Sequence, residues 1–229
     1  LLVDADYSQI ELRVLAHISG DEIMKKAFLD GVDIHTVTAS QVFNQPIEWV
    51  TPDLRSKAKA VNFGIVYGIG AFSLSKDIGV SVPKASEYIR SYLSKYSGIA
   101  HYMEQTVAKA KRDGYVETMF GRRRYIKELA AKNKNLQAFG ERVAKNTPIQ
   151  GTAADIIKIA MIKVYNRLKE SGLDARLILQ VHDELIVEAK EDCAEKVALL
   201  LKEEMENAVK LTVPMTVDVN IGKTWYDTH

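Results

Sequence analysis

Strand-like runs lie near both ends of the chain. LLVDAD at 1–6 is short and apolar, as buried strands are. LILQVHDELIVEA at 177–189 has two strand-forming arms around a polar tip, which predicts a hairpin, and VPMTVDVNIG at 213–222 predicts a final strand. We therefore expect a small antiparallel sheet built from the two ends of the chain.

The middle of the chain has the spacing of amphipathic helices. Asp33 and Pro83 stand where an N-cap and a first-turn proline are expected, and Gly68 and Gly114 stand at helix ends. Helices are expected over 9–19, 33–43, 53–68, 83–96, 99–114, 135–146, 152–172 and 191–209, with Pro148 separating the two that flank it. A hairpin turning at Gly121 is expected over 114–126. The order predicts an α+β fold, an antiparallel sheet flanked by helices with a mainly helical insertion.

Composition narrows the class of protein. The chain has 229 residues, 47% hydrophobic and 27% charged, which is enough to bury a core without disulfides. Cys193 is the one cysteine, so an intrachain disulfide and a cysteine-rich zinc module are excluded, and a reducing cytoplasmic setting is favoured. No apolar run approaches the roughly 20 residues that span a bilayer. The chain starts without Met inside a strand pattern, so we expect it to be a fragment of a longer protein.

The net charge of +1 hides two segments of opposite sign. Residues 109–134 hold nine basic and three acidic side chains, and residues 183–206 hold nine acidic and three basic ones. One interpretation is two solvated helix faces. The other is a middle segment that binds a polyanion and a carboxylate site that binds cations.

Three carboxylates stand at expected strand ends. Asp6 ends the first strand, and Asp183 and Glu184 lie at the tip of the later hairpin. If they converge, their repulsion raises their pKa values, and Mg²⁺ would remove that cost while leaving positions open for substrate phosphates. Two aspartates from separate strands could bridge two ions about 3.5–4 Å apart, as phosphoryl transfer requires. The alternative is that each acid is an ordinary turn or solvated residue.

A four-residue repeat of cations and aromatics marks the helix expected over 53–68. Arg55, Lys59, Phe63 and Tyr67 share one broad face of this helix. Cations at one end and aromatics at the other suit the phosphates, sugar and base of a nucleoside triphosphate. The alternative is a surface helix with half-buried aromatics. There is no P-loop motif in the sequence.

Several segments together resemble one family. DYSQIELR at 6–13 resembles motif A of the family A DNA polymerases, the bacterial DNA polymerase I group, and VHDE at 181–184 resembles their motif C. The Arg55, Lys59, Phe63 and Tyr67-Gly68 spacing is similar to their motif B. DIHTVTA at 33–39, GYVETMFGRRRYI at 114–126 and ERVAKNTPIQGTAADII at 141–157 are also similar to that group. The resemblance covers nearly the whole chain in the right order.

The resemblance implies an architecture, an activity and partners. Residues 1–20 and 141–229 would form the palm and residues 21–140 the fingers, with the thumb and an exonuclease-like domain missing upstream. The activity implied is template-directed addition of deoxynucleoside triphosphates to a primer 3′ end, in DNA replication and repair. The partners would be primer-template DNA and dNTP, with no membrane, in the bacterial cytoplasm at the nucleoid.

The resemblance also implies residue roles. Asp6, Asp183 and the Tyr7 backbone carbonyl would hold two Mg²⁺ ions, with Glu184 as an auxiliary catalytic carboxylate. Lys59 would donate a proton to the leaving pyrophosphate, and Glu11 would exclude a ribose 2′-hydroxyl. The implied nucleotide-binding residues are Tyr7, Gln9, Glu11, His35, Arg55, Lys59, Phe63 and Tyr67, and the implied DNA-binding residues are Arg142, Asn146, Gln150 and His182. The basic stretch Arg122 to Arg124 would follow template phosphates.

Two other functions compete with this one. A single-subunit RNA polymerase-like nucleotidyltransferase would share the carboxylates, but Glu11 and Phe63 leave neither room nor a hydrogen bond for a 2′-hydroxyl. A catalytically silent DNA-binding piece is the second alternative, and it applies to the isolated fragment more than to its parent.

Overall fold

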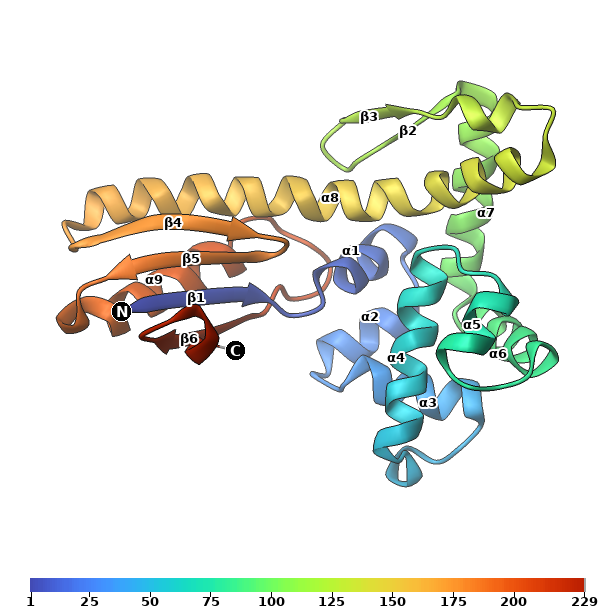
Figure 1. The fold of residues 1–229 in the computed structure, drawn as a ribbon, viewed down its shortest axis with the longest axis horizontal. Helices are drawn as coiled ribbons and strands as arrows, with labels where there is room; N and C mark the ends of the chain where they lie inside the picture. Colours follow the sequence, from blue (N-terminus) through green and yellow to red (C-terminus); the bar gives the residue numbers. More distant parts are fainter. Residues whose placement is uncertain (229) are drawn as a thin grey trace. The chain divides into compact units, whose positions relative to one another are not determined.

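The computed structural model describes residues 1–228 and divides into two compact units (Figure 1). The first, here called the sheet unit, joins Leu1–Arg13 to Gly151–His229. The second, here called the helical unit, is Val14–Gln150. None of the helices in the described part of the chain is long and apolar enough to cross a membrane.

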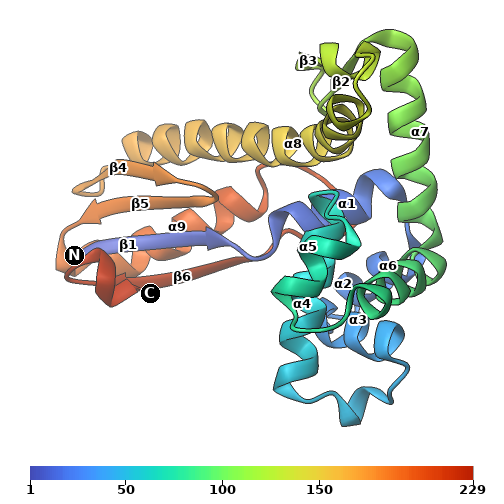
Figure 2. The same ribbon diagram turned by 45° about the vertical axis from the view of Figure 1, so that its right-hand side comes forward.

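The sheet unit holds one antiparallel sheet from the two ends of the chain, as the sequence predicts. Its strands are β1 (Leu2–Tyr7), β4 (Ala175–Val181), β5 (Glu184–Ala189) and β6 (Val217–Gly222), in the order β4-β5-β1-β6. Helix α9 (Ala194–Glu206) packs on β1, β5 and β6. Figure 2 shows β1 lying between β5 and β6, so the first strand is central in the sheet.

Alternation along β1 separates a core face from a polar face. Val3, Ala5 and Tyr7 are buried, and the Tyr7 hydroxyl donates a 2.6 Å hydrogen bond to the Met205 carbonyl of α9. Asp4 and Asp6 project to the opposite face because successive side chains in a strand alternate. The α9 side therefore carries the core, and the far side presents the acids.

The helical unit is a set of capped helices, most of them where the sequence predicts them. Side chains of Asp21, Asp33, Thr51 and Ser81 accept hydrogen bonds from backbone N–H groups at four helix starts. The helices are α2 (Glu22–Leu29), α3 (Ile34–Phe43), α4 (Pro52–Val66), α5 (Ala71–Asp77), α6 (Val82–Lys95) and α7 (Ser97–Asp113), followed by the hairpin β2 (Tyr115–Glu117) and β3 (Arg123–Tyr125). Short 3₁₀ turns lie at Ile47–Trp49, Lys127–Ala130, Glu191–Cys193 and Trp225–Thr228. The sequence patterns missed α2 and α5, which are short.

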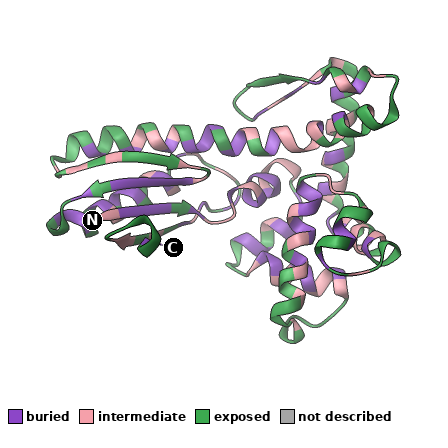
Figure 3. Ribbon diagram, in the orientation of Figure 1, coloured by how far each residue is buried: buried purple, intermediate pink, exposed green. Residues whose placement is uncertain are grey.

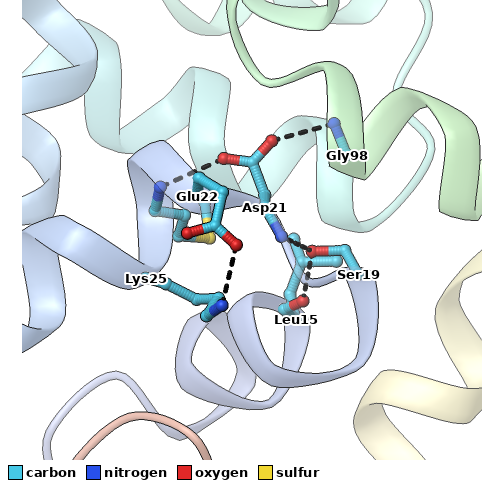
Figure 4. A network of polar contacts seen from close by, with 7 residues as sticks. Leu15, Ser19, Asp21, Glu22, Lys25 and Gly98 are labelled. Atoms are coloured by element: carbon cyan, nitrogen blue, oxygen red, sulfur yellow. Dashed lines mark hydrogen bonds and ion pairs between the residues drawn. The ribbon is translucent and has the colours of Figure 1, made fainter.

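Asp21 joins two helices that are distant in sequence (Figure 4). Its carboxylate accepts from the Met24 N–H at the start of α2 and from the Gly98 N–H at the start of α7. A Cβ at position 98 would lie 2.8 Å from the Asp21 Cα, so the close approach requires glycine there. The Asp21 N–H in turn donates to the Ser19 hydroxyl at the end of α1 (Ile10–Ser19).

Pro148 does not separate two helices, and this expectation was wrong. Helix α8 runs unbroken over Lys134–Ser171 with Pro148 inside it. An internal proline removes one backbone hydrogen bond and costs about 3 kcal/mol. Ala144, Ile149 and Ile156 are nevertheless buried on both sides of the proline (Figure 3). We infer that this burial offsets the local cost.

The two compact units meet after Arg13 and Gln150. The palm and fingers bounds expected after residues 20 and 140 stay predictions. The Arg13 guanidinium is tied to the sheet unit by hydrogen bonds to Ser8, Pro214 and Thr216. At the other boundary, Ala144 packs in the cluster below the β2–β3 hairpin. The assignment of the two units as palm and fingers stays a prediction.

Candidate active site

The sheet unit brings a row of carboxylates together. Asp6 on β1 is paired directly with Glu184 on β5 and with Asp218 on β6. Directly opposed residues of antiparallel strands project to the same face, so the three acids lie side by side. Asp183 is next in the chain to Glu184, and its carbonyl accepts a 3.3 Å bond from the Tyr7 N–H. The predicted convergence of Asp6, Asp183 and Glu184 is thus present in the geometry.

A two-residue turn presents Asp183. β4 ends at Val181 and β5 begins at Glu184, so His182 and Asp183 make the whole connection. His182 has φ +47°, the left-handed conformation that tight hairpins need. The Gln180 side-chain amide donates a 2.8 Å bond to the His182 carbonyl and braces the turn.

The acids repel one another. The pKa of Asp6 is raised to about 6, first by burial and then by Asp183, Glu184, Asp4 and Asp218. The pKa of Asp183 is also raised, mainly by burial. Such a cluster stores unfavourable charge energy that a divalent cation would relieve.

The carboxylates of Asp6 and Asp183 suit a cation that also binds oxygen atoms from other groups. Within residues 1–228, no group of three or more His, Cys, Asp or Glu side chains forms a metal site by itself. Mg²⁺ uses only one or two carboxylates together with waters, carbonyls and substrate phosphates. Asp6 and Asp183 supply these one or two carboxylates, and their mutual repulsion is what a divalent cation relieves, so the residues fit the predicted ion.

Asp218 was missed by the sequence analysis. It lies in VDVN, where an acid on the solvent side of a strand is ordinary. Its position becomes informative only when β6 pairs with β1, and this pairing joins residues more than 200 positions apart. The alternating pattern at 217–220 was the available signal.

The helical unit carries the second set of predicted residues on α4. The rings of Phe63 and Tyr67 stack with centroids 6.1 Å apart and planes 23° from parallel. Lys59 and Arg55 are exposed one and two turns before Phe63 on the same helix. A cavity of about 520 Å³ borders this end of α4 and is lined by Ala60, Phe63, Gly64, Tyr67, Ile69, Gly70, Ser73, Asp77 and Arg142. The cationic and aromatic face predicted from the spacing is present.

Arg55 is already engaged by a carboxylate of α3. Its Nε and Nη2 donate to the two Asp33 oxygens at 2.8 and 2.9 Å, a bidentate pair. The same carboxylate caps α3 by accepting from the Thr36 N–H. Burial would raise the pKa of Asp33, but the hydrogen bonds from Arg55 and Thr36 outweigh it and lower the pKa to about 2.

His35 lies beside this pair in the core of the helical unit. Its ring is 5.9 Å from the Phe63 ring, and its Nδ1 is 3.0 Å from the Asn62 side-chain amide nitrogen. Burial lowers the pKa of His35 to about 4, while Asp33 opposes the shift and Arg55 and Lys59 add to it. His35 is therefore a neutral imidazole at pH 7.

The sequence comparison decides the family. A model of DNA polymerase family A matches residues 1–227. The chain belongs to DNA polymerase family A. It is 53% identical to DNA polymerase I of Caldicellulosiruptor bescii over all of this chain and 27% of that protein. It is 49% identical to the thermostable DNA polymerase I of Thermus aquaticus over 98% of this chain and 27% of that protein.

A solved structure agrees with this membership. The POL domain of Pol1 from M. smegmatis, in complex with a DNA primer-template and dNTP, is 43% identical and has a TM-score of 0.94. The match covers 99% of this chain and 40% of that one. The chain spans about a quarter of the length of the curated family A relatives it matches.

The DNA-contact residues predicted for this family A chain lie on two elements. Arg142, Asn146 and Gln150 follow one another at four-residue spacing on α8, and His182 is in the β4–β5 turn. The Arg142 guanidinium lies 5.7 Å from the Phe139 ring centre, and a Cβ at Gly68 would come within 3.0 Å of its side chain. The Asn146 Oδ1 is buried without a hydrogen-bond partner among residues 1–228.

Several charges of the two segments form surface ion pairs, most of them with partners outside the segment. In the basic segment, Lys111 pairs with Glu141, Arg123 with Glu117, and Arg124 donates to the Thr147 hydroxyl. In the acidic segment, surface pairs join Arg176 to Glu188, Lys190 to Asp174 and Arg167 to Glu204. These pairs lie at the surface, whereas Asp183 and Glu184 belong to the carboxylate row.

Proposed function

We propose that this chain is the catalytic core of a template-directed DNA polymerase that adds deoxynucleotides to a primer 3′ end, in bacterial DNA replication and repair. The observation that carries the proposal is the direct pairing of Asp6 with Glu184 beside Asp183, in a member of family A. The relative crystallised with primer-template and dNTP supports these as the partners. The location proposed is the bacterial cytoplasm at the nucleoid; the bacterial relatives are consistent with the cytoplasmic part.

Asp6, Asp183 and the Tyr7 carbonyl would hold two Mg²⁺ ions, with Glu184 as an auxiliary carboxylate. When bound, the ions would lower the pKa of the primer 3′-hydroxyl and neutralise the developing charge on the triphosphate. The protein's own part is to hold Asp6 and Asp183 in place for the ions, against the burial and mutual repulsion that raise their pKa values. The sheet does this because β1 and β5 fix the backbone on both sides of the row.

The nucleotide would be held by residues of α3, α4 and the region around α1. Arg55, Lys59 and His35 would bind the phosphate oxygens, and the Lys59 ammonium would give a proton to the leaving pyrophosphate. Phe63 and Tyr67 would contact the sugar and the new base pair, with Gln9 as a further contact. Glu11 would crowd the 2′ position and exclude ribonucleotides.

The primer-template would be contacted by Arg142, Asn146, Gln150 and His182. Minor-groove acceptors differ little between correct base pairs, so these contacts would test the shape of the pair without reading its sequence. Arg122 to Arg124 would follow template phosphates.

Primer extension with Mg²⁺ tests the proposal on this chain and on a version extended upstream. Asp183→Asn should lower extension by about 10³-fold, roughly 4 kcal/mol, because one ion ligand loses its charge. Asp174→Asn is the matched control, since Asp174 is an exposed acid of the same unit that pairs with Lys190. Activity only in the longer version would place the DNA grip upstream. Equal activity of Asp183→Asn and its control would refute the proposal.

Sugar selection distinguishes the DNA polymerase from an RNA polymerase-like enzyme. Glu11→Ala should raise the ratio of rNTP to dNTP incorporation by at least about 10-fold, because the side chain at the 2′ position is removed. The measurement compares kcat/KM for dATP and ATP on one primer-template. A wild-type protein that uses both sugars equally would favour the RNA polymerase alternative.

A further inference from the structure

A chain of buried hydrogen bonds ends on His35. Tyr96, Thr38 and Asn62 have no exposed surface, and His35 is 2% exposed. The Tyr96 and Thr38 hydroxyl oxygens are 2.9 Å apart, and the Thr38 hydroxyl donates to the Asn62 Oδ1 at 3.1 Å. The Asn62 Nδ2 lies 3.0 Å from the His35 Nδ1. All four residues belong to the helical unit.

The orientation of the Asn62 amide sets the direction of each proton in this series of hydrogen bonds. A threonine hydroxyl has one proton, and the Thr38 proton goes to Asn62, so Thr38 must accept from the Tyr96 hydroxyl. With its oxygen occupied by Thr38, Asn62 turns its amide N–H groups toward His35. Because an amide nitrogen only donates, the His35 Nδ1 must be an acceptor and carry no proton.

The neutral imidazole then has its proton on Nε2. A doubly protonated ring would place an N–H of His35 against an N–H of Asn62, so the network opposes the imidazolium. The charged groups around the ring are Asp33 from the N-cap of α3, with Arg55 and Lys59 from α4. Within residues 1–228, the His35 Nε2 has no hydrogen-bond partner, so its N–H remains available to a ligand.

We propose that Asn62 is a positioning residue that holds His35 as the neutral Nε2–H tautomer, so that His35 binds a triphosphate oxygen as an uncharged donor. This inference rests on the proposed function for its ligand. Asn62 acts only through His35, and Thr38 and Tyr96 act through Asn62. The positive charge that meets the triphosphate then comes from Arg55 and Lys59 alone, and binding by His35 does not depend on its protonation near neutral pH.

Nitrogen NMR of the 229-residue chain tests the tautomer directly. The two ring nitrogens of ¹⁵N-labelled histidine have different shifts in the two tautomers, and His35→Gln identifies the His35 signals. Wild type should show the Nε2–H form without ligand at pH 7. Asn62→Asp should reverse it, because a carboxylate accepts from Nδ1–H, and should raise the pKa of His35. A wild-type Nδ1–H form, or an unchanged tautomer in Asn62→Asp, would overturn the proposal.

A second variant guards against misfolding of a buried aspartate. Thr38→Val keeps the shape of the side chain but removes the donor to the Asn62 Oδ1, so the amide can turn over and the Nδ1–H form should appear. Tyr92→Phe is the matched control, because Tyr92 is equally buried and its ring stacks on Tyr96, yet it is no part of the chain of bonds. It should leave the His35 spectrum unchanged. A Thr38→Val spectrum identical to wild type would count against the proposal.

Binding of dATP with Mg²⁺ provides a readout that a structural role would not change. In wild type, the Kd should change less than about 3-fold between pH 6 and 8. In Asn62→Asp, the Nε2 lone pair would face the phosphate at pH 8 and weaken binding about 10-fold, and protonation at pH 6 should restore it. If no variant binds dATP, the proposed function fails, while the tautomer measurement still decides the role of Asn62. A pH-independent Kd in Asn62→Asp would overturn the proposal.

Discussion

The carboxylate row of the sheet unit and the Arg55–Lys59 face of the helical unit differ in how their charges are balanced. On the sheet, Asp6 is paired directly with Glu184 and Asp218, and its pKa is raised to about 6. On the helices, Arg55 is paired with Asp33, and His35 is kept neutral. The first site is destabilised until a cation arrives. The second is internally balanced, so a ligand has to compete for Arg55.

The largest effect expected from this difference is at Asp6. Asp6→Asn should lower the rate of primer extension by at least about 10³-fold, because a metal ligand is lost. The same substitution should raise the melting temperature without Mg²⁺ at pH 8 by roughly 2–5 °C, because a repelled charge is removed. Thermal unfolding with and without Mg²⁺ checks it. A lower melting temperature in Asp6→Asn would show that the row is not strained.

An intermediate effect is expected at Arg55. Arg55→Gln should weaken dNTP binding about 10-fold or more and also lower stability, because Asp33 loses its bidentate partner. The stability loss should be modest, about 0.5–1 kcal/mol, since the pair is partly exposed. Calorimetric titration and urea unfolding measure the two effects. Lys57→Gln, which removes an exposed pair with Asp53 on the same helix, is the control. Equal dNTP binding in both variants would contradict the assigned role of Arg55.

The smallest effect concerns pH. The folded pKa of Asp6 is raised, so the folded chain binds more protons than the unfolded chain between pH 4 and 6, and this group stabilises less as pH rises through that window. The contribution of His35 to the free energy of unfolding has the opposite sign. Because folding lowers the pKa of its imidazole, this contribution is complete above about pH 6.5 and is lost as pH falls toward 4. Mg²⁺ should therefore raise the melting temperature by more at pH 8 than at pH 5.

The melting temperatures with and without Mg²⁺ at pH 5 and pH 8 are measured for Asp6→Asn as well. Subtracting its Mg²⁺ effect from that of wild type isolates the contribution of the Asp6 carboxylate. The variant should lose most of the difference between pH 5 and pH 8. His35→Gln should leave the Mg²⁺-dependent difference in place and remove only the loss of stability that His35 causes as pH falls from about 6.5 toward 4. A Mg²⁺ effect that is independent of pH in wild type would break the contrast between the two sites.

The parts of the two sites that depend on the local spacing of apolar and polar residues could be predicted from the sequence. Strand ends placed Asp6 and Asp183, and four-residue spacing placed Arg55 and Phe63 on one face of a helix. These follow from backbone geometry over a few residues. Antiparallel pairing of the ends of the chain was also predictable, because the strand patterns lie only there.

The parts that sequence reasoning missed depend on contacts between distant residues. Asp218 joins the row only through the β1–β6 pairing, and Asp33 meets Arg55 across 22 positions. The His35 tautomer depends on the order of four buried polar groups, and no periodic pattern encodes that order. Pro148 misled the helix assignment because local propensity gave way to burial along α8.

The two-residue turn at His182 and Asp183 has an evolutionary consequence. Strand side chains alternate between faces, so one inserted or deleted residue in this turn would shift β5 by one position against its neighbours and exchange its two faces. Glu184 would then face α9, and Leu185 would lie beside Asp6. Gene variants that change the length of this loop should therefore be absent from working relatives, whereas substitutions of His182 that preserve its left-handed conformation leave the register of β5 unchanged.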